Sequence, residues 1–111
     1  MRVAIVGSRH YPDPIKVVEY VRALPTDTVV VSGGAAGPDT WAEAAALYHG
    51  MTVRIFNADW LGLDSAAGML RNSLIVDDAD RLVAFWTGSS GTADSIAKAR
   101  ARGIPVEVIT P

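Results

Sequence analysis

The sequence contains no cysteine, which excludes disulfide bonds, thiol catalysis and thiolate metal sites. Its two histidines, His10 and His49, are far apart and lack the ordered carboxylates of a metal site, so we expect no bound metal. No apolar run approaches the roughly 20 residues of a membrane span. The short apolar stretch at the N-terminus lacks the cleavage region of a secretory signal. These features favour a cytoplasmic protein without membrane contact.

The sequence also has little excess charge and lacks two common nucleotide motifs. Ten Lys and Arg residues against 12 Asp and Glu residues give a formal net charge of −2. This balance disfavours non-specific nucleic-acid binding over the whole surface but permits a local basic groove. No turn has the G-x-G-x-x-G spacing of a dinucleotide site or the Lys-Ser/Thr pair of a P-loop. We therefore expect no cofactor such as NAD, and no ATP hydrolysis.

Five short apolar runs alternate with four helical patterns. The predicted strands span 3–6, 28–31, 52–56, 81–85 and 106–109, and the predicted helices span 14–24, 38–49, 65–77 and 92–102. Apolar residues on consecutive strand positions indicate a parallel sheet with helices on both faces. We predict one α/β domain over residues 1–111: a Rossmann-like, doubly wound parallel sheet of five strands with about four helices.

Three strands run into a glycine-bearing turn that leads to a helix. The turns are Gly7–Arg9, Ser32–Asp39 and Gly88–Thr92. A helix N-terminus carries unpaired N–H groups and partial positive charge, and glycine lets an anion approach the backbone. With the strand order 3-2-1-4-5, the first and third turns face each other across the crevice where such sheets bind ligands. The turns therefore predict a site for a phosphate-bearing ligand.

The candidate ligand-binding residues come from these turns and from the third predicted helix. They are Gly7, Ser8, Arg9, Gly33, Gly34, Asp39, Arg71, Asn72, Gly88, Ser89, Ser90, Gly91 and Thr92. The Gly88–Thr92 turn is the predicted phosphate site, because its hydroxyl and N–H groups can donate to phosphate oxygens. The alternative is a tight strand–helix turn with Thr92 as the helix N-cap.

Arg71 lies in a helix that is apolar on most sides, so its charge needs an anion, an acidic partner or a route to water. It either holds a phosphate or ribose, or pairs with an aspartate at position 77, 78 or 80. Arg9, beside the crevice, has the same two alternatives. Tryptophan usually lies in a core or an interface, and we expect this of Trp60 and Trp86. The alternative is that either residue stacks on a base.

Asp39, Glu43 and Asp94 are the candidate catalytic carboxylates. Asp39 suits the first turn of its helix, because a carboxylate there is favourable for the helix dipole. Glu43 follows one turn later on nearly the same face. The two carboxylates form either a ribose clamp or general base, or a solvated helix face.

The chain resembles the SLOG superfamily over nearly its whole length, and in particular the small YspA/YpsA-related branch. The resemblance rests on Gly7-Ser8-Arg9, Ser32–Asp39, Ala58-Asp59-Trp60, Ala67-Gly68 with Arg71-Asn72, Ala79-Asp80, and Phe85-Trp86 with Gly88–Thr92. It implies a Rossmann-like fold and a nucleotide-type ligand such as AMP, ADP-ribose or a cyclic nucleotide. A sensor or sequestering domain is the function that we expect.

Two better-known relatives point to alternative functions. The Lonely-guy phosphoribohydrolases, which release a base from a nucleoside monophosphate, carry a helical arginine, matched by Arg71, and a P-G-G-x-G-T-x-x-E motif. Ser95 stands at the catalytic glutamate of that motif, with Asp94 adjacent. N-glycosidase activity through Asp94, Asp39 or Glu43 is the first alternative. DprA, which binds single-stranded DNA, has a motif similar to Ser32–Asp39. DNA binding is the second alternative, and the lack of a dense Lys/Arg stripe disfavours it.

The third predicted helix is apolar around more of its circumference than a surface helix needs. Its apolar residues and glycine are Ala66, Ala67, Gly68, Met69, Leu70, Leu74, Ile75 and Val76. We predict a homodimer through helix 65–77.

Overall fold

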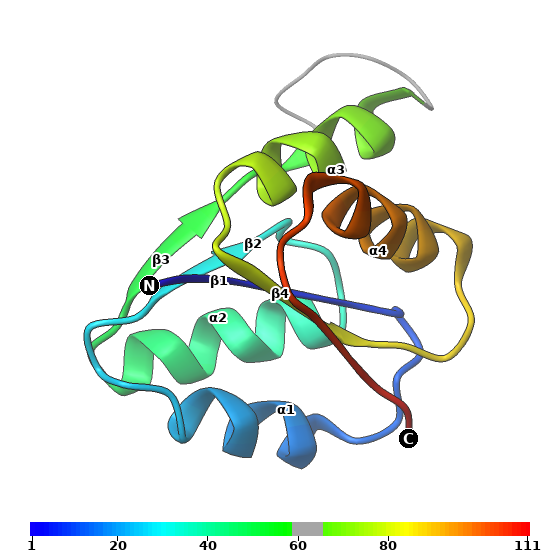
Figure 1. Cartoon of the computed structure of the whole chain (residues 1–111). Coiled ribbons are helices and arrows are strands. Elements are labelled where there is room, and N and C mark those ends of the chain that lie inside the picture. The colour runs from blue at the N-terminus through cyan, green and yellow to red at the C-terminus, as the bar shows by residue number, and fades with distance from the viewer. Residues whose placement is uncertain (59–65) are drawn as a thin grey trace.

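The computed structural model describes residues 1–58 and 66–111 and contains one parallel sheet between two layers of helices (Figure 1). The strands are β1 (Arg2–Gly7), β2 (Val29–Ser32), β3 (Thr52–Ile55), β4 (Arg81–Phe85) and β5 (Val106–Ile109). Their order is β3-β2-β1-β4-β5, and every neighbouring pair is parallel. The predicted fold class and strand order are confirmed.

Four helices of the described residues cover the sheet. They are α1 (Pro14–Arg22), α2 (Pro38–Tyr48), α3 (Ala66–Asp77) and α4 (Ser90–Arg102). The helix ends follow their sequence signals, since Asp13 caps α1 and Gly103 ends α4 with a φ of 76°. Helix α4 begins two residues earlier than predicted, because Ser89 and not Thr92 is its N-cap.

The core has two halves, one on each face of the sheet. Val17 and Val21 of α1 pack with Ala42 of α2 on one face. Ile75 of α3 and Ile96 of α4 pack on the other. This division follows from the alternation of side chains along each strand, which sends neighbouring apolar residues to opposite faces.

The strand order reverses between β1 and β4, and the chain is tightly packed there. The N–H group of Ser8 donates to the carbonyl of Phe85 at 2.9 Å. A Cβ atom on Gly7 would lie 2.5 Å from Cγ of Pro38 and 2.7 Å from the carbonyl oxygen of Phe85. Gly7 therefore lets the start of α2 approach the sheet next to the reversal.

Part of the predicted loop at 57–64 lies outside the described residues, including Asp59, Trp60 and Asp64. Trp86 is described and packs against the core beneath α4, with its indole N–H donating to the carbonyl of Ser89 at 2.8 Å. Among the described residues, no helix has the length and apolar character needed to cross a membrane.

Candidate functional site

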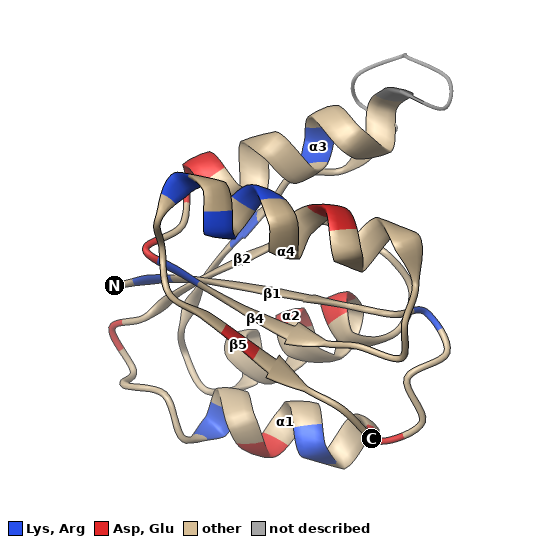
Figure 2. Cartoon of the chain, turned by 45° about the vertical axis from the view of Figure 1, so that its right-hand side comes forward, with Lys and Arg blue, Asp and Glu red and all other residues tan. Residues whose placement is uncertain are grey.

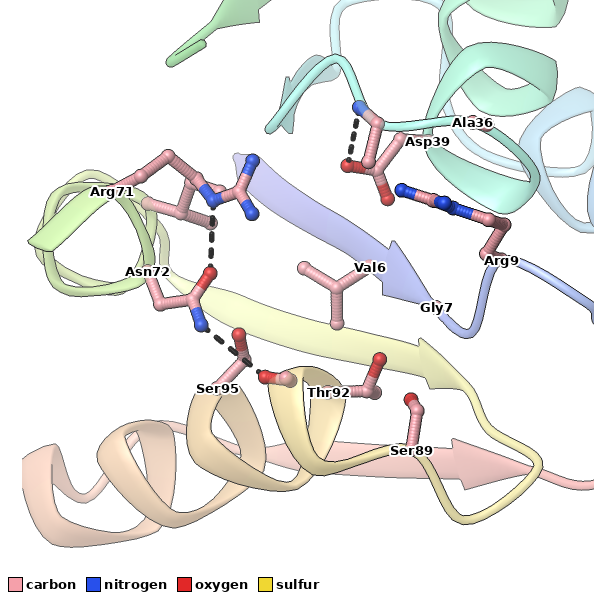
Figure 3. Close-up of a pocket in the computed structure, with 13 residues that line it drawn as sticks. Val6, Gly7, Arg9, Ala36, Asp39, Arg71, Asn72, Ser89, Thr92 and Ser95 are labelled. Carbon is pink, nitrogen blue, oxygen red and sulfur yellow. Dashed lines mark hydrogen bonds between the residues drawn. The ribbon is translucent and has the colours of Figure 1, made fainter. Parts of the chain in front are cut away.

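A pocket of about 200 Å³ lies beyond the carboxyl ends of β1 and β4, among α2, α3 and α4 (Figure 3). It is lined by Val6, Gly7, Arg9, Ala35, Ala36, Asp39, Arg71, Asn72, Ile75, Ser89, Gly91, Thr92 and Ser95. This is the position where ligands bind in open doubly wound sheets.

The N-terminal turn of α4 forms one wall of the pocket and is uncapped. An N-cap serine usually bonds to an N–H group in the first helical turn, but the Ser89 hydroxyl makes no such bond. It lies 2.7 Å from the Ser8 hydroxyl, whose oxygen accepts from the N–H of Thr87 at 2.9 Å. The first N–H groups of a helix have no intrahelical partner, and without a cap those of residues 90–92 have no hydrogen-bond partner in the described chain.

Two buried hydroxyls of α4 face the same pocket. Thr92 is 5% exposed and Ser95 is 2% exposed, and both line the cavity (Figure 3). Neither hydroxyl has a hydrogen-bond partner among the described residues. Both side-chain oxygens reach the open space of the pocket, where they can donate hydrogen bonds to a polar ligand.

Arg71 enters the pocket from α3 and is held by neutral partners. Its Nη1 donates to the carbonyl of Gly33 at 3.0 Å, and its Nε donates to Oδ1 of Asn72 at 3.0 Å. A Cβ atom on Gly33 would lie 2.5 Å from Nη1, so the glycine makes room for the guanidinium. Asn72 in turn donates to the carbonyl of Gly91 at 3.2 Å, which ties α3 to the start of α4.

The predicted alternative, an ion pair between Arg71 and a neighbouring aspartate, is wrong. Asp77 pairs with Arg102, whereas Asp78 pairs with both Arg2 and Arg54. Asp80 also pairs with Arg2. Arg71 therefore keeps its positive charge available to the pocket.

Arg9 supplies a second positive charge from the opposite side (Figure 3). Its side chain is exposed and makes no hydrogen bond or ion pair with the part of the chain that the structure describes. The two guanidinium groups and the uncapped turn of α4 surround one cavity. Together they suit an anion with several oxygen atoms.

Asp39 is the carboxylate of the pocket and is only 4% exposed. Its Oδ2 accepts from the N–H groups of Gly33 at 3.1 Å and Ala35 at 3.3 Å. Burial raises the pKa of Asp39 to about 7, the backbone bonds and Arg71 oppose the rise, and the charge of Glu43 adds to it. The group therefore titrates near neutral pH.

We expect Asp39→Asn to change the pH dependence of stability. The pKa of Asp39 is higher in the folded state than the roughly 3.9 of an unfolded aspartate, so the folded state binds the proton more tightly. The contribution of Asp39 to the free energy of unfolding is fully present below pH 4. It falls by about 1.4 kcal/mol per pH unit as the pH rises from there to the folded-state pKa of about 7. In urea unfolding between pH 4 and 8, this loss should be smaller for Asp39→Asn than for the wild type. Parallel curves would contradict the expectation, and Asp27→Asn is the control at an exposed site.

The other two candidate carboxylates do not line this pocket. Glu43 accepts a hydrogen bond from the Ser32 hydroxyl. Asp94 accepts from Lys98 at 2.7 Å and from Asn72 at 3.0 Å. Of the three, Asp39 alone borders the space between the two arginines.

The structure divides the predicted ligand-binding residues into a lining group and a supporting group. The lining group is Gly7, Arg9, Asp39, Arg71, Asn72, Ser89, Gly91 and Thr92. The others do not line this cavity: Ser8 lies next to Ser89, Gly33 lies against Arg71, Gly34 and Gly88 lie in the adjoining turns, and Ser90 is the first residue of α4. Val6, Ala35, Ala36, Ile75 and Ser95 also line it and were not predicted to do so. Two signals existed for this group: Ala35 and Ala36 belong to the predicted Ser32–Asp39 turn, and Ser95 stands at the motif position of a catalytic glutamate.

Comparisons with known proteins agree with the fold. No family model and no curated protein sequence matches the chain. Among solved structures, DNA processing protein A (DprA) from Streptococcus pneumoniae superposes with a TM-score of 0.77 at 22% identity. The match covers 96% of this chain and 49% of the DprA chain, so this chain spans about half the length of that protein. The chain therefore has a DprA-like fold.

Proposed function

We propose that the chain is a nucleotide-binding domain of the YspA/YpsA-related SLOG branch, acting as a sensor or sequestering domain. Its ligand is a nucleotide or nucleotide derivative of the AMP, ADP-ribose or cyclic-nucleotide type. The observation that carries this proposal is the N-cap serine that leaves its own helix uncapped. Ser89 bonds to Ser8, so the free N–H groups of α4 remain open to a phosphate.

Each side chain of the pocket has a role in this proposal. Arg9 and Arg71 neutralise the phosphate from opposite sides, while Thr92 and Ser95 donate hydrogen bonds to its oxygens. Asp39 accepts a hydrogen bond from a ribose hydroxyl. Its titration near pH 7 means that protonation weakens this acceptor, adds an O–H donor and lowers the negative charge near the phosphate.

Calorimetry with AMP, ADP-ribose and cyclic AMP tests the proposal, with adenosine as the phosphate-free control. We expect saturable binding of at least one phosphate-bearing compound, no binding of adenosine at the same concentration, and weaker binding at higher salt. Silence across a wider nucleotide panel would contradict the proposal.

The catalytic alternative is hydrolysis of the N-glycosidic bond of a nucleoside monophosphate. Asp39 is the candidate carboxylate within the pocket, but it is held against Gly33 and Ala35, and Ser95 occupies the glutamate position. We therefore expect AMP to remain intact after long incubation with abundant protein, as followed by chromatography. Release of free adenine would favour the hydrolase over the binding domain.

Single-stranded DNA is the second alternative, and the likeness to a DNA processing protein is the observation in its favour. The basic residues of α4 lie in its C-terminal half, away from the turn that faces the pocket (Figure 2). We expect no salt-sensitive shift of single-stranded oligonucleotides in a mobility assay. Such a shift, abolished by Arg9→Met or Arg71→Met, would support DNA binding at this site.

We also propose a homodimer through α3. Leu70 and Leu74 of this helix are exposed large apolar residues. Burying them against a second copy removes apolar surface from water. Light scattering should show a dimer for the wild type and a monomer for Leu74→Glu. Leu47→Glu is the control, because it makes the same change at an exposed residue of α2, and it should leave the dimer intact. A monomer at high concentration would contradict this.

A further inference from the structure

We infer that a second pocket, next to the phosphate pocket, holds the base of the nucleotide and recognises an exocyclic amino group through Asp94. The inference rests on the proposed function and adds the class of base. The pocket has a volume of about 380 Å³ and lies between α3 and α4. It is lined by Gly68, Met69, Arg71, Asn72, Ser90, Gly91 and Asp94.

The two pockets adjoin. Both are lined by Arg71, Asn72 and Gly91, so a ligand that occupies one can extend along the shared wall into the other. A Cβ atom on Gly91 would find no atom within 4 Å, which shows that this wall is open. A nucleoside monophosphate has the matching form, with a phosphate at one end and a base at the other.

Asp94 provides the hydrogen-bond acceptor of the second pocket. Lys98 and Asn72 both donate to its Oδ2, and its Oδ1 accepts no hydrogen bond from the described residues. Partial burial opposes ionisation, but the hydrogen bonds from Lys98 and Asn72 and the charge of Lys98 hold the pKa of Asp94 below its usual value. An ionised carboxylate only accepts hydrogen bonds, so Oδ1 is free to accept one from a ligand.

The remaining lining residues suit a planar ring. The Met69 side chain is 58% exposed, and a thioether makes favourable contacts with aromatic rings. The planar guanidinium of Arg71 stacks on such rings. A Cβ atom on Gly68 would find no atom within 4 Å, so a ligand can approach the backbone of this residue. The ligand class is therefore a nucleotide whose base carries an amino group, such as adenine.

Calorimetry of the full chain with three compounds tests the inference. AMP and purine riboside 5′-monophosphate differ only in the 6-amino group, and ribose 5-phosphate lacks the base. We expect AMP to bind about tenfold more tightly than purine riboside 5′-monophosphate, the effect of one hydrogen bond to a charged acceptor. Ribose 5-phosphate should bind more weakly than either.

The variant Asp94→Ala should reduce this ratio to about one and leave the affinity for ribose 5-phosphate unchanged. Asp77→Ala removes the same charge from the exposed surface of α3 and should leave the ratio as in the wild type. Equal loss for all three compounds in Asp94→Ala would assign Asp94 a structural role and overturn the inference.

The wild-type comparison decides the matter even if Asp94→Ala does not fold. Binding of ribose 5-phosphate with equal affinities for AMP and purine riboside 5′-monophosphate would overturn the base pocket but keep the phosphate site. Absence of binding for all three compounds would overturn the base pocket, and the proposed function falls with it only if ADP-ribose, cyclic AMP and the wider nucleotide panel also fail to bind.

Discussion

Replacing Arg71 by methionine is expected to weaken AMP binding by about 10- to 100-fold, the effect of losing a charge-assisted hydrogen bond worth about 1.5–3 kcal/mol. Arg71 is placed for this role by the carbonyl of Gly33 and by Asn72, and neither partner neutralises its charge. Methionine retains much of the apolar length of the side chain. The fold should therefore survive with a loss of about 1 kcal/mol from the missing internal bonds.

Arg22→Met is the matched control for charge, because Arg22 is exposed on α1 and does not line the pocket. Calorimetry should show little change for Arg22→Met and a large loss for Arg71→Met. Equal losses in both variants would show that net charge, and not a contact with the phosphate, controls affinity. Unchanged binding in Arg71→Met would remove the arginine from the site.

Substitution of Gly7 by alanine is expected to destabilise the chain by about 3 kcal/mol, at the upper end of overpacking effects. The added Cβ atom would approach Cγ of Pro38 to 2.5 Å and the carbonyl oxygen of Phe85 to 2.7 Å. Neither neighbour is the end of a flexible side chain, since one is a proline ring and the other is backbone. Thermal unfolding should show a Tm lower by more than about 10 °C.

Gly68→Ala in α3 is the control for this change. Its Cβ atom would find no atom within 4 Å, and alanine is favoured over glycine inside a helix. We expect Gly68→Ala to stabilise the chain by about 0.5–1 kcal/mol. A similar small effect of Gly7→Ala would show that the start of α2 can move away from β1 at little cost.

The fold was predictable because the strong signals along the chain agree. Consecutive apolar residues in Ile5 and Val6 or Leu82 and Val83 indicate a strand covered on both faces, and the structure buries all four. Proline at the start of α1 and α2 and glycine after α2 and α4 mark helix ends by local backbone preference. These signals are local, so they can be interpreted from the sequence alone.

The site was predictable only in outline. The sequence identified its turns but could not show that Ser89 bonds to Ser8 in preference to its own helix, because that choice depends on the approach of β1 and β4. The sequence also could not show that Arg71 forms no ion pair with the aspartates at positions 77, 78 and 80. Arg2, Arg54 and Arg102, all distant in sequence, satisfy those carboxylates.

The burial of Asp39 is a further tertiary effect. Its place in the first turn of α2 was evident from the sequence, but its enclosure by residues 33–35 was not. Nothing in the sequence distinguishes a buried carboxylate at this position from a solvated one. The raised pKa of Asp39 follows from that enclosure.

The central claim is that the free N–H groups at the start of α4 bind the phosphate of a nucleotide. The most direct test is a titration of the ¹⁵N-labelled chain with AMP, followed by amide chemical shifts in NMR spectra. We predict that the amides of Ser90, Gly91 and Thr92 shift most and saturate together with the Nε signal of Arg71. Unchanged amides in this turn at saturating AMP, or shifts confined to α1 and the far end of α2, would contradict the claim.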